Sequence, residues 1–234
     1  MAPAAPLPKK NGDIQNWGNI QGTHLTHEIA LAAEQYSGLT VVIANNNSEC
    51  QRLTEELTYF FEGDVFNFPD WETLPYDYFS PHQDIISERL STLAKLPLCN
   101  KGILVIPALS AQLRLPPLNY ILGHSFTLET GQTLDIEKLK KTLISAGYQS
   151  VDAVYGHGEF CMRGAILDIF PMGSDQPFRI DLFDEEIETI RWFNPENQRS
   201  TETTNSIQLL PAKEVPLDTN GIRCFKQRWF DFFE

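Results

Sequence analysis

The segment Phe178-Arg-Ile-Asp-Leu-Phe183 alternates apolar and polar side chains up to its final phenylalanine. This period of two is typical of a β-strand that buries one face. Two more strand-like segments flank it, with turn residues in the gaps: Ala165-Ile-Leu-Asp-Ile-Phe170 and Ile187-Glu-Thr-Ile-Arg-Trp-Phe193. The region therefore predicts an antiparallel meander. With an expected edge strand at residues 125–129 and a helix at residues 135–146, it indicates an α+β domain.

Helix-like and strand-like segments alternate along the first hundred residues. Leu39-Thr-Val-Val-Ile-Ala44 is a nearly continuous apolar run rich in β-branched residues, which favours a strand covered on both faces. The other predicted strands are residues 65–68 and 102–106, and the predicted helices are residues 23–36, residues 83–96 and a segment capped by Asn47 or Ser48. Strands separated by helices indicate a parallel α/β sheet.

Composition narrows the class of protein. The chain has 234 residues, 42% of them hydrophobic, and a formal net charge of -13, which disfavours autonomous binding to a phosphate backbone. No apolar stretch approaches the roughly 18 residues of a membrane span, and the Pro-rich start is not a signal peptide. The four cysteines form no C-x-x-C pair, so a zinc ribbon is excluded, and their scatter suits a reducing cytosol: Cys50, Cys99, Cys161 and Cys224.

A phosphate loop would give the α/β region an enzymatic role, and the nearest candidate is Trp17-Gly-Asn-Ile-Gln-Gly-Thr-His24. Gly22 fits the second glycine of G-x-x-x-x-G-K-[ST], but Thr23 stands where lysine is required and His24 where serine or threonine is required. We interpret the segment as the helix entry of a degenerate site. A nucleotide-hydrolysing helicase lobe with an unusual phosphate loop is the alternative.

Three other segments contain residues that could carry chemistry, and each has a simpler interpretation. His24, His27 and Glu28 do not follow a zinc-hydrolase order, and residues 123–127 miss the last glycine of G-x-S-x-G. Gly156-His-Gly-Glu159 could hold an acid and a base, although a glycine-flanked turn is the more common arrangement. Enzymatic activity is therefore the weaker hypothesis.

Two long stretches carry the most specific signal. They are Phe68-Pro-Asp-Trp-Glu-Thr-Leu-Pro-Tyr-Asp-Tyr-Phe-Ser-Pro-His-Gln-Asp-Ile-Ile-Ser-Glu-Arg-Leu-Ser-Thr-Leu93 and Gly158-Glu-Phe-Cys-Met-Arg-Gly-Ala-Ile-Leu-Asp-Ile-Phe-Pro171 with Phe178-Arg-Ile-Asp-Leu-Phe-Asp-Glu-Glu-Ile-Glu188. In these motifs the sequence resembles the N-terminal region of the bacterial transcription-repair coupling factors, the Mfd family, over about residues 20–234. It is also similar to the excision-repair protein UvrB, whose R-G-D-x-x-[DE]-[IV]-F-P pattern begins at Arg163, with Ala165 in place of the usual Asp.

The resemblance implies a degenerate helicase-like (RecA-like) parallel-sheet domain with an inserted α+β domain that carries an antiparallel sheet. The implied limits are a disordered tail at residues 1–20, the helicase-like domain at 21–120, the inserted UvrA-docking domain at 121–211 and a return segment at 212–234. Neither a working phosphate loop nor the DNA-clamping hairpin of UvrB is expected.

The resemblance also implies a function. This cytoplasmic module would recruit UvrA to a stalled RNA polymerase for nucleotide excision repair, without catalysis, cofactor or metal of its own. ATP, magnesium, RNA polymerase and DNA would bind regions beyond residue 234.

The same resemblance carries UvrA-contact roles onto Arg163, Arg179 and Phe183. The strand pattern agrees, because Arg179 and Phe183 fall on the outer face of the strand, and an arginine beside an aromatic ring is a common hot-spot pair. Exposed on that face, they are expected to contribute little to the stability of the fold. The alternative is an ordinary surface on which Asp168 or Asp181 pairs the arginines.

Overall fold

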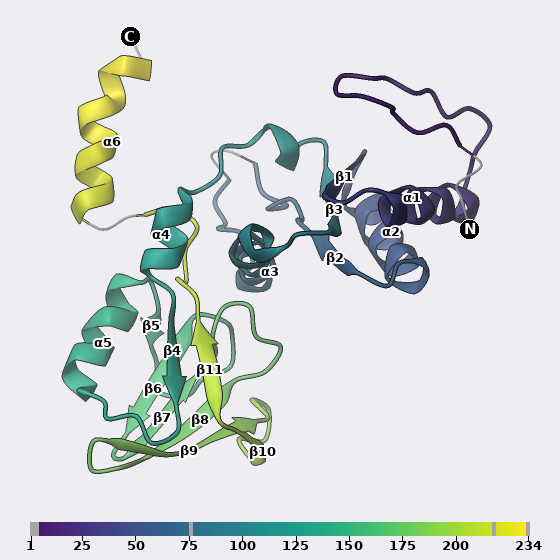
Figure 1. Cartoon of the computed structure of the whole chain (residues 1–234). Coiled ribbons are helices and arrows are strands. Elements are labelled where there is room, and N and C mark those ends of the chain that lie inside the picture. Colours follow the sequence, from purple (N-terminus) through teal and green to yellow (C-terminus); the bar gives the residue numbers. More distant parts are fainter. Residues whose placement is uncertain (1–4, 75–76, 217–218, 233–234) are drawn as a thin grey trace. The chain divides into compact units, whose positions relative to one another are not determined.

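The computed structural model describes residues 5–74, 77–216 and 219–232. The chain has a mixed α/β fold with one parallel sheet and two sheets built of antiparallel pairs, apart from one parallel edge pair (Figure 1). It divides into two compact units, residues 1–78 with 95–113 and residues 79–94 with 114–234. We describe each unit by itself.

The first unit is built on a parallel three-stranded sheet in the order β1-β3-β2. Its strands are β1 (Leu39–Ala44), β2 (Asp64–Asn67) and β3 (Gly102–Pro107). Helices α1 (Thr23–Gln35) and α2 (Asn47–Phe60) pack together, and their apolar side chains share one core with Ile103 and Val105 of β3. The predicted parallel sheet is therefore confirmed.

Two local expectations for this unit are wrong. Strand β1 is not covered on both faces, because Val42 packs toward the helices while Val41 and Ile43, which point the other way, are 51% and 63% exposed. Helix α2 is capped by Asn46 rather than by Asn47 or Ser48. The Asn46 side chain accepts a hydrogen bond of 2.9 Å from the backbone N–H of Glu49, which satisfies a free donor of the first turn.

The second unit contains a six-stranded sheet in the order β10-β9-β8-β7-β6-β5. Antiparallel pairs join β6 (Glu159–Arg163), β7 (Ile166–Ile169), β8 (Phe178–Phe183), β9 (Glu186–Phe193) and β10 (Ser200–Thr204), and β5 (Gln149–Ser150) runs parallel to β6. A second sheet pairs β4 (Phe126–Glu129) with β11 (Ser206–Leu209). The meander predicted from β7, β8 and β9 is confirmed, while the pattern missed β5, β6, β10 and β11.

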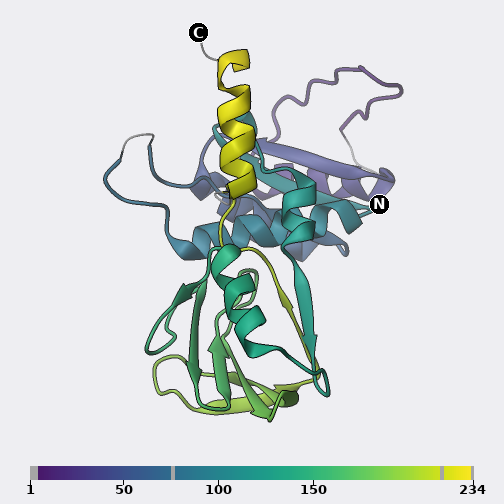
Figure 2. The ribbon, with the colours of Figure 1, turned by 90° about the vertical axis from the view of Figure 1, so that its left-hand side faces the viewer.

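One main core fills the second unit. Helix α5 (Ile136–Ser145) contributes Leu139 and Leu143, which pack with inward side chains of β6–β9 and of the β4–β11 pair. Figure 2 shows α5 lying alongside the strands of this unit. Asp135 caps the helix by accepting a hydrogen bond of 2.9 Å from the backbone N–H of Lys138. Helix and sheets therefore form the expected α+β arrangement.

Helix α3 (Gln83–Lys95) belongs almost entirely to the second unit, although the sequence placed it with the first domain. Leu90 joins the main core, and the Ser87 hydroxyl accepts a hydrogen bond of 2.7 Å from the backbone N–H of Gly173. Arg89, fully buried, pairs with Glu214 through Nε and Oε1 at 2.5 Å. The segment around Glu214, expected to lead back to the first domain, is thus tied to the second unit.

The remaining helices are the 3₁₀ turns η1 (Leu96–Leu98) and η2 (Ser110–Gln112), the short α4 (Leu118–Gly123) and the longer α6 (Thr219–Phe232). The aromatic residues Trp71, Tyr76, Tyr78 and Phe79 predict that rings hold the segment before α3 in place, but the rings of Tyr78 and Phe79 are exposed. Tyr76 lies outside the described residues. No helix in the described ranges combines the length and hydropathy needed to cross a membrane.

Candidate protein-docking site

The candidate site lies on the face of the six-stranded sheet that points away from the main core. We call the following side chains of β6–β9 the outer face: Arg163, Asp168, Arg179, Asp181, Phe183 and Arg191. On β8 the side chains of Phe178, Ile180 and Leu182 point into the core, as the alternation predicted. A small apolar cluster covers the start of β6 on the outer side: Val154, Cys161, Phe170 and Phe193. The opposite end, where the β6–β7 and β8–β9 turns lie, is more open.

Asp168 organises the outer face. It sits on β7 directly opposite Arg179 of β8, and its side chain is fully buried. Its Oδ1 accepts a hydrogen bond of 2.7 Å from Arg179 Nε and its Oδ2 one of 2.9 Å from Arg179 Nη2, an arrangement that matches the fork of a guanidinium. Arg163 Nη2, from the other neighbouring strand, also donates to Oδ2. One carboxylate thus pairs both candidate arginines.

Arg179 is not the exposed residue that the alternation suggested, because its side chain is only 15% exposed. Besides the fork to Asp168, Nη1 donates a hydrogen bond of 3.0 Å to the carbonyl of Gln198, and the guanidinium carbon lies 4.9 Å from the centre of the Phe193 ring. The hydrogen bonds to Asp168 raise the pKa of Arg179 above its usual value, so the group stays charged. The expected exposure of Arg179 is therefore wrong, and its contacts predict that it contributes to the stability of the fold.

Arg163 and Phe183 are the accessible members of the site. Each is the last residue of its strand, followed by a two-residue hairpin turn that positive φ angles at Gly164 and Asp184 permit. Strands β6 and β8 run in the same direction, so the two turns lie at one end of the sheet, and the backbone N–H of Leu182 donates to the carbonyl of Ala165 at 2.8 Å. Phe183 is 70% exposed and the Arg163 side chain 49%.

Sequence reasoning missed Arg191. It lies opposite Arg179 on β9, pairs with Asp181, and has a side chain that is 37% exposed. Thr189 also donates to Asp181, at 2.8 Å. The outer-face residues include three arginines and two aspartates, and Glu159 of β6 and Glu186 opposite Phe183 add two carboxylates to the same face, so the face carries no net positive charge. Arg191 was missed because a β-bulge after Asp181 shifts the pairing of β8 with β9, so simple alternation along the sequence does not show which face Arg191 occupies.

The side chains of Glu159 and His157, which were candidates for an acid and a base, make hydrogen bonds within the fold instead. The Glu159 carboxylate accepts hydrogen bonds from the backbone N–H groups of Tyr155 and Gly156, at 2.8 and 2.9 Å. His157 Nδ1 lies 2.6 Å from Asp84 and its Nε2 lies 2.7 Å from the carbonyl of Ser174. The Gly156–Glu159 segment is thus the glycine-flanked turn that sequence analysis preferred.

The side chains of residues 123–127 and of His24 and His27 are not arranged for catalysis or metal binding. Ser125 donates a hydrogen bond of 2.6 Å to the carbonyl of Ile121, just after α4. His24 and His27 do not converge, since His24 Nε2 lies 3.6 Å from Glu28 while the His27 ring packs edge-on against Phe60. Across the described residues, no group of three or more His, Cys, Asp or Glu side chains could hold a metal ion.

Cysteine chemistry and small-molecule binding have little support. Burial raises the pKa of the Cys50 thiol to about 11, and burial also raises that of Cys161, so neither is a thiolate near neutral pH.

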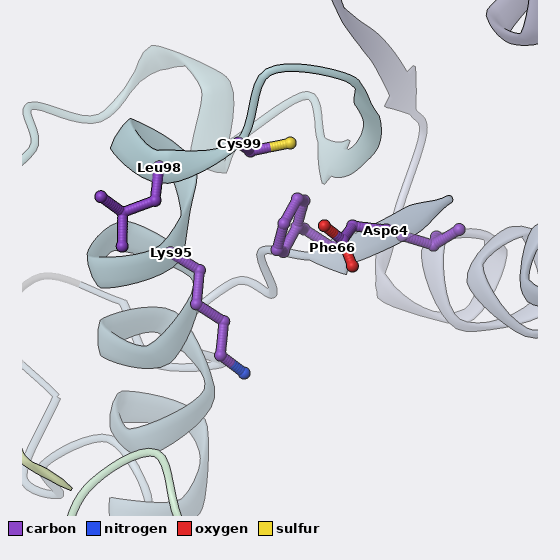
Figure 3. A pocket seen from close by; sticks show the side chains of 6 residues that line it. Asp64, Phe66, Lys95, Leu98 and Cys99 are labelled. Carbon is purple, nitrogen blue, oxygen red and sulfur yellow. The ribbon is translucent and has the colours of Figure 1, made fainter. Parts of the chain in front are cut away.

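A pocket of about 380 Å³ in the first unit lies beside Cys99. Figure 3 shows Cys99 and the Phe66 ring on its walls, with Lys95 and Asp64 nearby; Cys99 and Asp64 belong to no group of three side chains that could hold a metal ion among the described residues.

Comparison with known proteins finds a family match within the second unit. Residues 126–215 match the family described as the UvrB interaction domain. This region is similar to the UvrB interaction domain. The match runs from β4 to the residue after Glu214, and it contains all three predicted contact residues, Arg163, Arg179 and Phe183.

The similarity extends well beyond the UvrB interaction domain. The chain is 44% identical over 228 residues to the transcription-repair-coupling factor of Escherichia coli (strain K12), and 42% identical over 227 residues to that of Haemophilus influenzae; each alignment covers 97% of this chain. The transcription-repair-coupling factor of Bacillus subtilis (strain 168) is 33% identical over 74% of the chain. The resemblance recognised in the sequence is confirmed, and the chain spans about 20% of the length of the first two relatives.

Proposed function

We propose that this chain is the UvrB-like module of a transcription-repair coupling factor, which recruits UvrA to a stalled RNA polymerase for nucleotide excision repair. The identity to transcription-repair-coupling factors and the UvrB interaction domain support this role. The observation that carries it is the open end of the outer face, where the exposed ring of Phe183 and the half-exposed Arg163 project from adjacent hairpin turns. An exposed aromatic ring beside arginines is a typical protein-binding hot spot.

The direct test is a titration of the purified chain with UvrA, followed by calorimetry or by co-elution from a sizing column. We expect a stable complex that weakens as salt is added, because salt screens the contacts of exposed arginines such as Arg163 with carboxylates of a partner. Failure of the purified chain to bind UvrA at micromolar concentrations would contradict the proposal.

The first unit would then be a degenerate helicase-like domain, without a cofactor, in a cytoplasmic protein. Its parallel sheet and the helix that begins at Thr23 support this interpretation. RNA polymerase, DNA, ATP and magnesium would be bound by other regions of the whole protein, of which this chain matches about a fifth.

We predict no ATP hydrolysis and no tight ATP binding by this chain. Thr23, at the start of α1, supplies no positive charge where a phosphate loop needs lysine. In the second turn of α1, Glu28 is 3% exposed and accepts a hydrogen bond of 3.0 Å from the backbone N–H of Ala5, which adds a negative charge nearby. A thermal-shift experiment with ATP and magnesium should leave the melting temperature where magnesium alone leaves it. A rise that saturates at micromolar ATP and disappears in Thr23→Ala would instead support the helicase-lobe alternative.

We also predict that the chain binds duplex DNA weakly or not at all by itself. Its net charge of -13 opposes the phosphate backbone, and the outer face offers few arginines, most of them paired with aspartates. Fluorescence anisotropy at about 0.15 M salt should give a Kd no tighter than about 10⁻⁶ M, within the range of nonspecific binders. A submicromolar Kd under these conditions would show that the charge argument fails.

A further inference from the structure

The two arginines that share Asp168 are held very differently. Arg179 uses three nitrogens, two on Asp168 and one on the Gln198 carbonyl, and its guanidinium lies over Phe193. Arg163 reaches Asp168 through Nη2, and its side chain is 49% exposed against 15% for Arg179. The tightly held arginine is therefore mostly buried, and the loosely held arginine is the more exposed to solvent.

The shared carboxylate links these two environments. Asp168 is fully buried, and a buried carboxylate persists as an ion only when it is paired and hydrogen-bonded. Arg179 supplies that pairing from β8, because its Nε and Nη2 donate hydrogen bonds to both oxygens of Asp168. Because Oδ2 also accepts from Arg163, the direction in which the Arg163 guanidinium points depends on where Arg179 holds the carboxylate.

An exposed arginine without such an anchor samples many rotamers, and ordering it on binding costs affinity. Immobilising one flexible side chain costs about 0.5–1.5 kcal/mol, which corresponds to a loss of about twofold to tenfold in affinity. An anchor that orders the side chain before the partner arrives removes most of this cost.

We propose that Asp168 is a positioning residue of the docking site, which orders Arg163 for contact with UvrA, and that Arg179 acts by holding Asp168 rather than by touching the partner. This inference rests on the proposed function. Of the three predicted contact residues, Arg163 and Phe183 would then touch UvrA, and Arg179 would act only by holding Asp168 in place.

The first test needs no variant and no partner. Nuclear magnetic relaxation of the arginine Nε–Hε groups in the free chain reports their order on the picosecond to nanosecond timescale. We expect Arg163 to be nearly as ordered as Arg179 and much more ordered than the exposed Arg199, for which the described residues offer no side-chain partner. If Arg163 is as mobile as Arg199, Asp168 does not position it and the inference is overturned.

The second test is a double-mutant cycle with Asp168→Asn and Arg163→Ala, in which UvrA affinity is measured under conditions where every variant is folded. Asparagine keeps the shape of Asp168 and removes its charge. We expect Asp168→Asn to weaken binding about tenfold in the parent chain and less than twofold in the Arg163→Ala chain, because its effect passes through Arg163. Equal losses in both chains, or no loss in the parent chain, would mean that Asp168 serves the fold alone.

Asp181→Asn is the matched control, since Asp181 lies on the same face and pairs with Arg191 rather than with Arg163. Its effect on UvrA affinity should be the same with and without Arg163→Ala. If the parent chain does not bind UvrA at all, the proposed function fails and the relaxation experiment alone decides whether Arg163 is ordered. If Asp168→Asn does not fold, the same relaxation experiment decides the inference.

Discussion

Arg179→Ala should lower the free energy of unfolding by about 3 kcal/mol. The variant would leave the fully buried carboxylate of Asp168 with Arg163 as its remaining charged partner, and breaking a buried ion pair from one side typically costs about 3–5 kcal/mol. We place the expected loss at the lower end because Arg163 still donates to Oδ2. Urea denaturation followed by circular dichroism measures this loss directly.

Arg199→Ala is the matched control for this experiment. Arg199 is exposed and lies close to β10 in the same unit, so its truncation should change the free energy of unfolding by no more than about 0.5 kcal/mol. If Arg179→Ala and Arg199→Ala unfold at the same urea concentration, the contacts of Arg179 do not stabilise the domain.

Phe183→Ala should weaken UvrA binding about thirtyfold and leave the melting temperature nearly unchanged. The ring is 70% exposed at the end of β8, so it contributes little to the core, but a partner that covers it would exclude water from a large apolar surface. Truncating an aromatic anchor commonly costs about 2 kcal/mol or more, which is about thirtyfold in Kd. Calorimetric titration and thermal melting of the same preparation give both quantities.

Two control variants separate binding from stability. Tyr155→Ala removes another exposed ring from the same unit, in the loop between β5 and β6 at the other end of β6, and should leave both quantities unchanged. Ile180→Ala, on the buried face of β8, should destabilise the fold by about 2 kcal/mol or more and affect UvrA affinity little while the chain stays folded. Parent-like UvrA affinity in Phe183→Ala would show that this end of the sheet is not the docking surface.

The periodic elements of the fold could be predicted from the sequence. Residues 178–182 alternate strictly, and residues 83–96 repeat apolar side chains at helical spacing, because in both cases one core decides the pattern. Strand β6 was missed because Glu159 and Arg163 flank a short apolar stretch that follows a glycine-rich turn. Strand β10 is entirely polar, and strand β11 has four residues whose partner, β4, is distant in the chain.

The site was predicted in part. Alternation placed Arg179 and Phe183 on one face, which is where the structure has them. Their exposure could not be predicted, because it depends on Asp168 from the next strand, Gln198 from a turn and Phe193 from β9. These are tertiary contacts, and a single sequence contains no local signal for them. The contact roles of Arg163, Arg179 and Phe183 stay predictions until UvrA binding is measured.

The buried pair of Arg89 and Glu214 sets the smallest piece of this chain that could be excised as a folded domain. A fragment trimmed to residues 126–215 would keep Glu214, 6% exposed, but lose the guanidinium that neutralises it from α3. It would also lose the hydroxyl of Ser87 that accepts from Gly173, and the side chain of Leu90 that fills the main core. The compact unit therefore extends beyond residues 126–215, and a fragment meant to fold by itself should include the helix at residues 83–95.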